Sequence, residues 1–152
     1  MAATWSPTDH SEYVTVTTTA ATRNSQLGSA YQSARSNLPV PLGVSFVTYT
    51  VTNVGSGEGT GPGCRLGLTN GVASLTSYAG SDNNGIGYLS SGNVQKGAAV
   101  ALTLTSFTTN DVIGVYVDYN SRVARFNKNG GALSAAVDIG SLGDEFYYCS
   151  SL

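Results

Sequence analysis

Alternation of apolar and polar residues, with many β-branched side chains, dominates this chain, and helical spacing is almost absent. In Val44–Val51 the even-numbered residues fall on one predicted face, and Val47, Tyr49 and Val51 fall on the other. The run Val112–Tyr119 is almost continuously apolar, which predicts a strand buried on both faces. Further strands are expected at Tyr13–Thr17, Arg65–Thr69, Ala99–Leu104, Arg122–Asn127, Ala135–Ile139 and Phe146–Cys149.

The segments between these strands are rich in Gly, Asn, Ser and Pro. Residues 22–38 are polar and predicted to be irregular, with a short helical turn as an option within 28–37. Gly55–Gly63 is expected to be a glycine-rich excursion. Reversals are expected at Tyr119–Ser121 and Asn129–Gly131. Short strands separated by turns about every 8–12 residues are typical of an all-β sandwich.

Composition narrows the class of protein. The 152 residues predict one domain spanning 1–152, with residues 1–40 forming N-terminal strands and an irregular arm of it. Only 11% of residues are charged and 41% are hydrophobic, which favours a folded, weakly charged domain. A net charge of −2 gives no attraction to nucleic acid or anionic membranes. We expect no transmembrane helix and no signal peptide.

Residues that could carry catalysis or bind metal are few. His10 is the only histidine, and no predicted strand carries two carboxylates at alternate positions, so we expect no enzyme. We expect no cofactor and no metal site, since the acidic residues near Asp144 lack the spacing of a calcium loop. Cys64 and Cys149 are predicted to be small buried residues, and a disulfide would require them to be neighbours.

One loop combines aromatic rings with short polar groups, as a sugar-binding site requires. The candidate ligand-binding residues are Tyr78, Asp82, Asn83, Asn84 and Tyr88, with a second candidate patch at Tyr31 and Arg35. The alternative interpretation places Tyr88 in the core and assigns the asparagines to turns.

The C-terminal half resembles a known family. Phe107–Asp118 resembles the segment aF-x-x-G-D-V-I-G-v-x-x-D of SPRY domains, which are also called B30.2-like. Val123–Gly130 is similar to their l-x-F-x-k-N-G hairpin, and Gly85–Gly92 to their W-G-Y…G element. Weaker similarities lie at Phe46–Val51, Arg65–Leu68 and Phe146–Ser150. The resemblance implies a concanavalin A-like jelly-roll sandwich of two antiparallel sheets.

This sequence departs from the family pattern at four places, one of them at Val47 or Thr48, which stands where the family has a strand glutamate. Asn110 replaces a glycine, Ile86 a tryptophan and Tyr147 a proline. The opening Thr4–Asp9 resembles the start of SPRY-like domains in bacteriophage virion proteins, where an "R-s" element matching Arg35-Ser36 follows.

The resemblance implies a non-enzymatic structural protein of a bacteriophage virion, displayed on capsid or tail and assembled in the host cytoplasm. Its expected partners are other virion proteins, further copies of itself in a symmetric array and a host-surface glycan, without nucleic acid or membrane insertion. One alternative is a lectin-like, glycan-binding receptor-recognition module. Another is an intracellular peptide-binding SPRY domain, and a hydrolase is the weakest.

Overall fold

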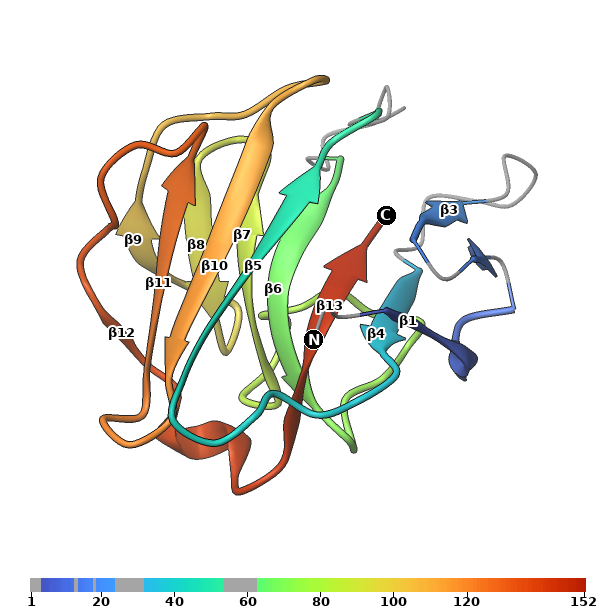
Figure 1. Ribbon diagram of the computed structural model, residues 1–152, viewed down its shortest axis with the longest axis horizontal. Coiled ribbons are helices and arrows are strands. Elements are labelled where there is room, and N and C mark those ends of the chain that lie inside the picture. Colours follow the sequence, from blue (N-terminus) through green and yellow to red (C-terminus); the bar gives the residue numbers. More distant parts are fainter. Residues whose placement is uncertain (1–3, 13, 18, 24–31, 54–62) are drawn as a thin grey trace.

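The computed structural model describes residues 4–12, 14–17, 19–23, 32–53 and 63–152, and it is built from two facing antiparallel sheets (Figure 1). The large sheet runs in the order β1 (Trp5–His10), β4 (Ser33–Ser36), β13 (Phe146–Ser151), β6 (Arg65–Asn70), β7 (Gly85–Leu89), β8 (Asn93–Lys96) and β9 (Ala99–Thr103). The small sheet runs β12 (Val137–Asp138), β11 (Val123–Lys128), β10 (Val112–Asp118) and β5 (Val44–Thr50). A ribbon of β2 (Val14–Val16) and β3 (Ala21–Arg23) and the 3₁₀ turn η1 (Gly140–Leu142) complete the described elements.

The core lies between the two sheets and follows the alternation of the sequence. In β5 the even-numbered residues are exposed and Ser45, Val47 and Tyr49 are half-buried, which confirms the predicted alternation of the two faces. The fully buried residues include Ile113, Val115 and Val117 of β10, Leu68 of β6, Ile86 and Tyr88 of β7, and Phe126 of β11. Each fully buried large apolar side chain contributes about 1.5–3 kcal/mol to folding.

Two sequence-based predictions are wrong. β10 is not buried on both faces, because Val112 and Tyr116 are half-exposed on the outer side of the small sheet. Residues 22–38 are not irregular throughout, because β4 is a fully buried strand between β1 and β13. The Ser-Ala-Arg-Ser sequence of β4 lacks apolar alternation, so the apolar pattern did not predict this strand. Residues 24–31 and 54–62 lie outside the described part of the chain, and the prediction for the Gly55–Gly63 excursion falls mostly there.

The two cysteines are buried and free, as expected for small buried residues. Burial raises the pKa of the Cys64 thiol to about 12 and also raises the pKa of Cys149. Both thiols are therefore neutral and poor nucleophiles near pH 7.

Glycines allow one connection to lie directly on the large sheet. Gly67 and Gly87 pair across β6 and β7, on the side that faces away from the core. A Cβ atom at Gly87 would lie only 2.4 Å from the carbonyl oxygen of Ala79, and one at Gly80 would lie 2.3 Å from that of Gln95. Residues 71–84, which join β6 to β7, therefore lie against the outer face of the large sheet.

The carboxylate of Asp111 joins the start of β10 to the turn after β11. It accepts hydrogen bonds from the Thr108 backbone N–H and the Asn129 side-chain amide, both at 2.8 Å. The Lys128 ammonium lies 2.9 Å from the same carboxylate. Asn129 Oδ1 in turn accepts a hydrogen bond from the Val112 N–H at 2.8 Å. These contacts couple the Asp-Val-Ile-Gly segment to the Asn-Gly segment.

Positive φ angles explain the residues chosen at these turns. Asn110, which stands where the SPRY pattern has glycine, has φ +73°, and Asn129 and Gly130 have φ +52° and +70°. Asparagine tolerates this left-handed region better than most residues do. The departure at Asn110 therefore preserves the turn.

The Asp111 contacts predict a specific acid sensitivity. The Lys128 hydrogen bond, followed by those from Thr108 and Asn129, lowers the pKa of Asp111 to about 2. A carboxylate with a lowered folded-state pKa stabilises the fold above its unfolded pKa of about 4, and this contribution disappears as pH falls towards 2. We expect Asp111→Asn to unfold at lower urea concentration than wild type at pH 7, with the gap closing near pH 2.

The matched control is Asp144→Asn, because the Asp144 side chain is 96% exposed and its ion pair with Arg122 is at the surface. That variant should show little gap at either pH. If the urea midpoints of Asp111→Asn and wild type differed equally at pH 7 and pH 2, the Asp111 carboxylate would not be the source of the stabilisation.

Candidate functional site

Residues 71–84 form a well-anchored surface, called here the loop platform, at the end of the sandwich where η1 and the link into β5 also lie (Figure 1). The Ser33 N–H donates to the Leu75 carbonyl at 2.8 Å, and the Ser33 hydroxyl donates to the Ser77 carbonyl at 2.6 Å. The Ala79 N–H donates to the Ser151 hydroxyl at 2.9 Å. Hydrogen bonds to strands β4 and β13 thus anchor the loop platform to the large sheet.

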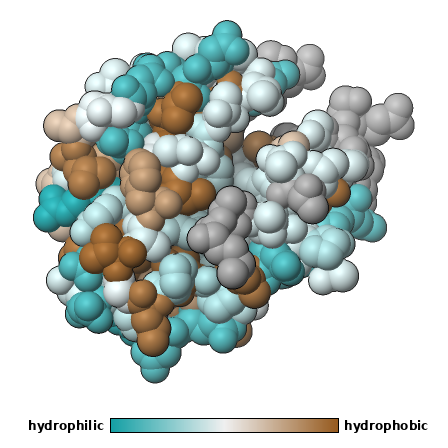
Figure 2. Space-filling model, in the orientation of Figure 1, coloured by the Kyte–Doolittle hydropathy of each residue, from teal (hydrophilic) through white to brown (hydrophobic). Residues whose placement is uncertain are grey.

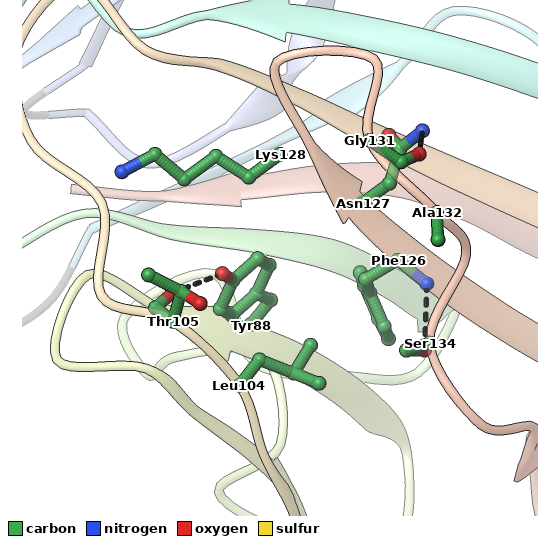
Figure 3. A pocket seen from close by; sticks show the side chains of 9 residues that line it. All are labelled: Tyr88, Leu104, Thr105, Phe126, Asn127, Lys128, Gly131, Ala132 and Ser134. Atoms are coloured by element: carbon green, nitrogen blue, oxygen red, sulfur yellow. Dashed lines mark hydrogen bonds between the residues drawn. The ribbon is translucent and has the colours of Figure 1, made fainter.

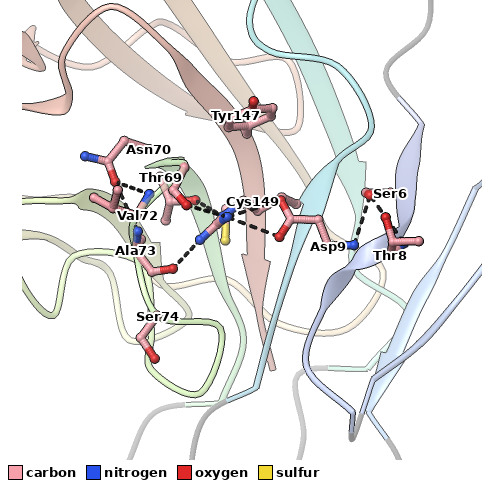
Figure 4. A network of polar contacts seen from close by, with 12 residues as sticks. Ser6, Thr8, Asp9, Thr69, Asn70, Val72, Ala73, Ser74, Tyr147 and Cys149 are labelled. Atoms are coloured by element: carbon pink, nitrogen blue, oxygen red, sulfur yellow. Dashed lines mark hydrogen bonds and ion pairs between the residues drawn. The ribbon is translucent and has the colours of Figure 1, made fainter.

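The buried guanidinium of Arg35 also anchors this surface, and Figure 4 labels its partners Asp9, Thr69 and Ala73. Its Nη1 lies 3.1 Å from both carboxylate oxygens of Asp9 and 3.1 Å from the Gly71 carbonyl. Its Nε donates to Thr69 Oγ1 at 3.3 Å, and its Nη2 donates to the Ala73 carbonyl. One side chain on β4 therefore joins β1, β6 and the loop platform.

This geometry corrects the second predicted patch. Arg35 is only 4% exposed, and its donors already serve protein acceptors, so it positions the platform and does not face a ligand. Tyr31, the other residue of that patch, lies outside the described residues.

The polar residues predicted at the first site lie together on the platform, and several form its turn. Asp82 accepts hydrogen bonds from the backbone and side-chain amides of Asn84, at 2.8 and 3.0 Å. Asn84 Oδ1 accepts one from the Asn70 amide at 3.1 Å. Asp82 and Asn83 are exposed, and the Asn83 carbonyl accepts a hydrogen bond from the Ser141 hydroxyl of η1. The exposed tip is therefore preorganised by local hydrogen bonds.

The two tyrosines predicted at the first site lie in different environments. The guanidinium of Arg65 stacks over the Tyr78 ring, 3.4 Å from its centroid, so this face of the half-exposed ring is already covered. Tyr88 belongs to the core, is 1% exposed and packs edge-on against Phe107 and Phe126. Its hydroxyl donates to the Thr105 carbonyl. Tyr88 therefore does not join the platform site, which corrects that part of the prediction.

The structure adds exposed residues that sequence patterns did not single out. Val72 on the platform is 79% exposed, although it is a large apolar residue. Ala98, in the β8–β9 turn, is exposed and donates its N–H to the Gly80 carbonyl. An isolated valine in a polar loop carries no sequence signal that would distinguish it from a packed one.

A separate cavity of about 300 Å³ opens between the two sheets (Figure 3). Tyr88, Leu104 and Phe126 contribute apolar atoms to its lining, and Asn127 and Ser134 contribute polar ones. The Asn127 amide already donates to the Gly131 carbonyl, and Ser134 Oγ accepts from the Phe126 N–H. Lys128 also lines the cavity, so its lining combines apolar and polar groups.

Acidic and basic side chains near the sandwich ends pair with one another. Asp138 lies 3.0 Å from Lys96, which lowers the pKa of that carboxyl, and Asp144 lies 2.8 Å from Arg122. Among the described residues, no group of three or more His, Cys, Asp or Glu side chains is placed to hold a metal ion. The described part of the chain also has no helix long and apolar enough to cross a membrane.

The family model for the SPRY domain matches residues 47–152. The chain belongs to the SPRY domain family. The crystal structure of the SPRY domain of human HERC1 superposes with a TM-score of 0.78 at 19% identity, covering 97% of this chain and 89% of that one. A second human SPRY domain structure gives a TM-score of 0.67 at 15% identity, covering 93% and 89%. No curated protein matches the chain.

These similarities confirm the jelly-roll-like β-sandwich expected for a SPRY domain. The family match begins within β5, whereas β1 and β4 precede it in the chain and still extend the large sheet beside β13. Arg35 is thus a residue outside the family match that anchors a loop inside it. Neither comparison bears on the bacteriophage part of the resemblance, which stays a prediction.

The Arg35 contacts predict a marked loss of stability in Arg35→Lys. Lysine presents its donors from a single nitrogen and cannot reach Asp9, Thr69 and two loop carbonyls at once. We expect the free energy of unfolding to fall by about 3 kcal/mol, measured by urea denaturation, together with faster proteolysis within residues 71–84.

Arg122→Lys is the control, because the carboxylate that pairs with Arg122 is almost fully exposed. It should change stability by no more than about 0.5 kcal/mol. Equal losses in the two variants would show that the Arg35 network has no special role.

Proposed function

We propose that this SPRY domain is a non-enzymatic protein-binding module that contacts its partner through the loop platform. The observation that carries the proposal is the anchoring of residues 71–84 by Arg35, Ser33 and Ser151. A loop held in one conformation loses little entropy on binding, which favours specific recognition. SPRY domains typically bind proteins, and sandwich folds commonly place binding residues on loops at one end.

The surface chemistry of the platform favours a protein segment over a sugar. Val72 offers an exposed apolar side chain, and Asp82 and Asn83 offer exposed polar groups in the same loop. A sugar needs an open aromatic face, but Arg65 covers one face of Tyr78. Glycan recognition is therefore the second candidate. An intracellular peptide-binding role uses the same surface as the proposal.

The setting that we propose is a virus particle, with copies of the domain displayed on capsid or tail and held by neighbouring virion proteins. The support is the opening Thr4–Asp9, whose sequence resembles virion SPRY-like domains. In the structure Trp5–His10 forms β1, and Asp9 in it binds Arg35. The segment that resembles virion proteins is thus part of the folded domain.

Selection from a displayed library of random linear peptides tests the binding proposal. Peptides enriched on the wild-type domain should bind the Asp82→Ala/Asn83→Ala variant at least tenfold more weakly, because the altered side chains form the exposed tip of the platform. Isothermal titration calorimetry measures the change, and a tenfold loss corresponds to about 1.4 kcal/mol.

The control is Thr109→Ala, an exposed threonine in the connection before β10. It should leave peptide affinity unchanged. Equal affinities for wild type and the double variant would refute the platform as the binding site, and binding on a glycan array without any peptide enrichment would favour the lectin alternative.

The proposed setting has its own test. Mass spectrometry of purified particles of the source virus should find the chain at a fixed copy number per particle, as symmetric display requires. Absence of the chain from intact particles would contradict a virion role without affecting the peptide-binding result.

A further inference from the structure

The free edge of β5 is the least protected of the four edges of the two main sheets. The large sheet ends at β1, which contains Pro7 and Asp9, and at β9, whose pairing with β8 is interrupted by a bulge. Proline, charge and bulges are the usual devices that prevent a sheet edge from pairing. At the end of the small sheet, β12 is only two residues long. β5 has seven residues, no proline, no charge and unbroken register with β10.

Exposed apolar side chains gather along the same segment. Among the described residues seven large apolar side chains are exposed, and four of these lie between positions 38 and 46: Leu38, Leu42, Val44 and Phe46. No charged residue occurs from Ser36 to Asn53. Figure 2 shows this side of the molecule, where apolar surface is interspersed with weakly polar surface. An uncharged, β-branched strand with an apolar face is the typical signature of a pairing edge.

The hydrogen-bond pattern identifies which backbone groups face the free edge. The Tyr119 N–H donates to the Gly43 carbonyl, and the Val51 N–H donates to the Asp111 carbonyl, so odd-numbered residues of this segment direct their backbone groups towards β10. The N–H and C=O groups of the even-numbered residues Val44, Phe46, Thr48 and Thr50 therefore point the other way. No described strand pairs with β5 on that side.

Phe46 does not block this edge. A Cβ atom at Gly114 would lie 2.7 Å from Phe46 Cζ, so the phenyl ring leans over Gly114 of β10. Phe46 is nevertheless 53% exposed. The ring thus adds apolar surface beside the edge without covering the backbone groups that a second strand would use.

We propose that a second copy of this chain pairs with β5, strand β5 against strand β5, about a twofold axis at Val47. An antiparallel register centred there places Val44 opposite Thr50 of the second copy and Phe46 opposite Thr48. All four residues with free backbone groups then form hydrogen-bonded pairs, whereas a register centred on Phe46 or Thr48 leaves one of them unpaired. The absence of charge means that the twofold axis brings no like charges together.

The resulting dimer joins two small sheets into one continuous sheet and places the apolar stripes of Val44 and Phe46 from both copies on one outer face. This specifies the contact between copies that the proposed symmetric display requires. It makes no use of the loop platform, so the two proposals can be tested separately on the same variants.

Analytical ultracentrifugation of the full chain tests the proposal, with Thr48→Pro as the first variant. Proline at position 48 removes an N–H that faces the free edge and leaves the hydrogen bonds to β10 intact. Thr48→Lys is a second variant that places charge on the edge. Wild type should sediment as a dimer and both variants as monomers. Their circular dichroism and peptide affinity should be unchanged.

The control for these variants is Thr103→Lys, which places the same charge on the exposed residue of edge strand β9 and should leave the dimer intact. A wild-type chain that stays monomeric up to its solubility limit would overturn the proposal. A dimer that persists in both Thr48 variants would overturn the choice of surface.

Cysteine cross-linking tests the register. The double variant Val44→Cys/Thr50→Cys should form a disulfide-linked dimer on mild oxidation, because directly opposed residues lie within disulfide range. Val44→Cys/Thr48→Cys, which is out of register, should cross-link at least tenfold more slowly. The reverse order of rates would overturn the register centred on Val47.

Discussion

The buried cation of Arg35 is the constraint on which much of this domain depends. A guanidinium removed from water must find a partner for nearly every donor, because an uncompensated buried charge is strongly destabilising. Here the partners come from Asp9 of β1, Thr69 of β6 and the carbonyls of Gly71 and Ala73. Satisfying one side chain therefore fixes the edge strand, the centre of the large sheet and the start of the loop platform in one arrangement.

The need to give each buried polar group a partner explains why buried polar residues gather on the outer face of the large sheet. Ser33, Arg35, Arg65 and Ser151 are all buried although they lie outside the apolar core. Glycines at positions such as Gly87 let the loop platform approach the sheet closely enough to satisfy these groups. A polar underside and an exposed polar tip thus belong to the same loop, and the buried anchors hold that tip in one arrangement.

The scarcity of charge also has structural consequences. The described ion pairs lie in the Arg35 network, beside the turns and near the sandwich ends, for example between Lys128 and Asp111, and the central strand β10 carries charge only at its last residue. A sheet edge without charge has no intrinsic protection against pairing. The same low charge from which the sequence predicts no nucleic-acid partner also leaves β5 without a charged residue, which is the basis of the proposed contact with another copy.

The sequence alone determined the strands with clear alternation, the sandwich class and the signature turns, because these follow from the local period of apolar residues and from residues that tolerate positive φ. It also placed Asp82, Asn83 and Asn84 together, since they are adjacent in the chain. It could not reveal β4, whose polar residues are buried only because β1, β13 and the platform supply partners. Tertiary structure likewise decided that Tyr88 packs in the core and that Arg35 acts as an anchor, because burial and hydrogen-bond partners come from residues distant in the sequence.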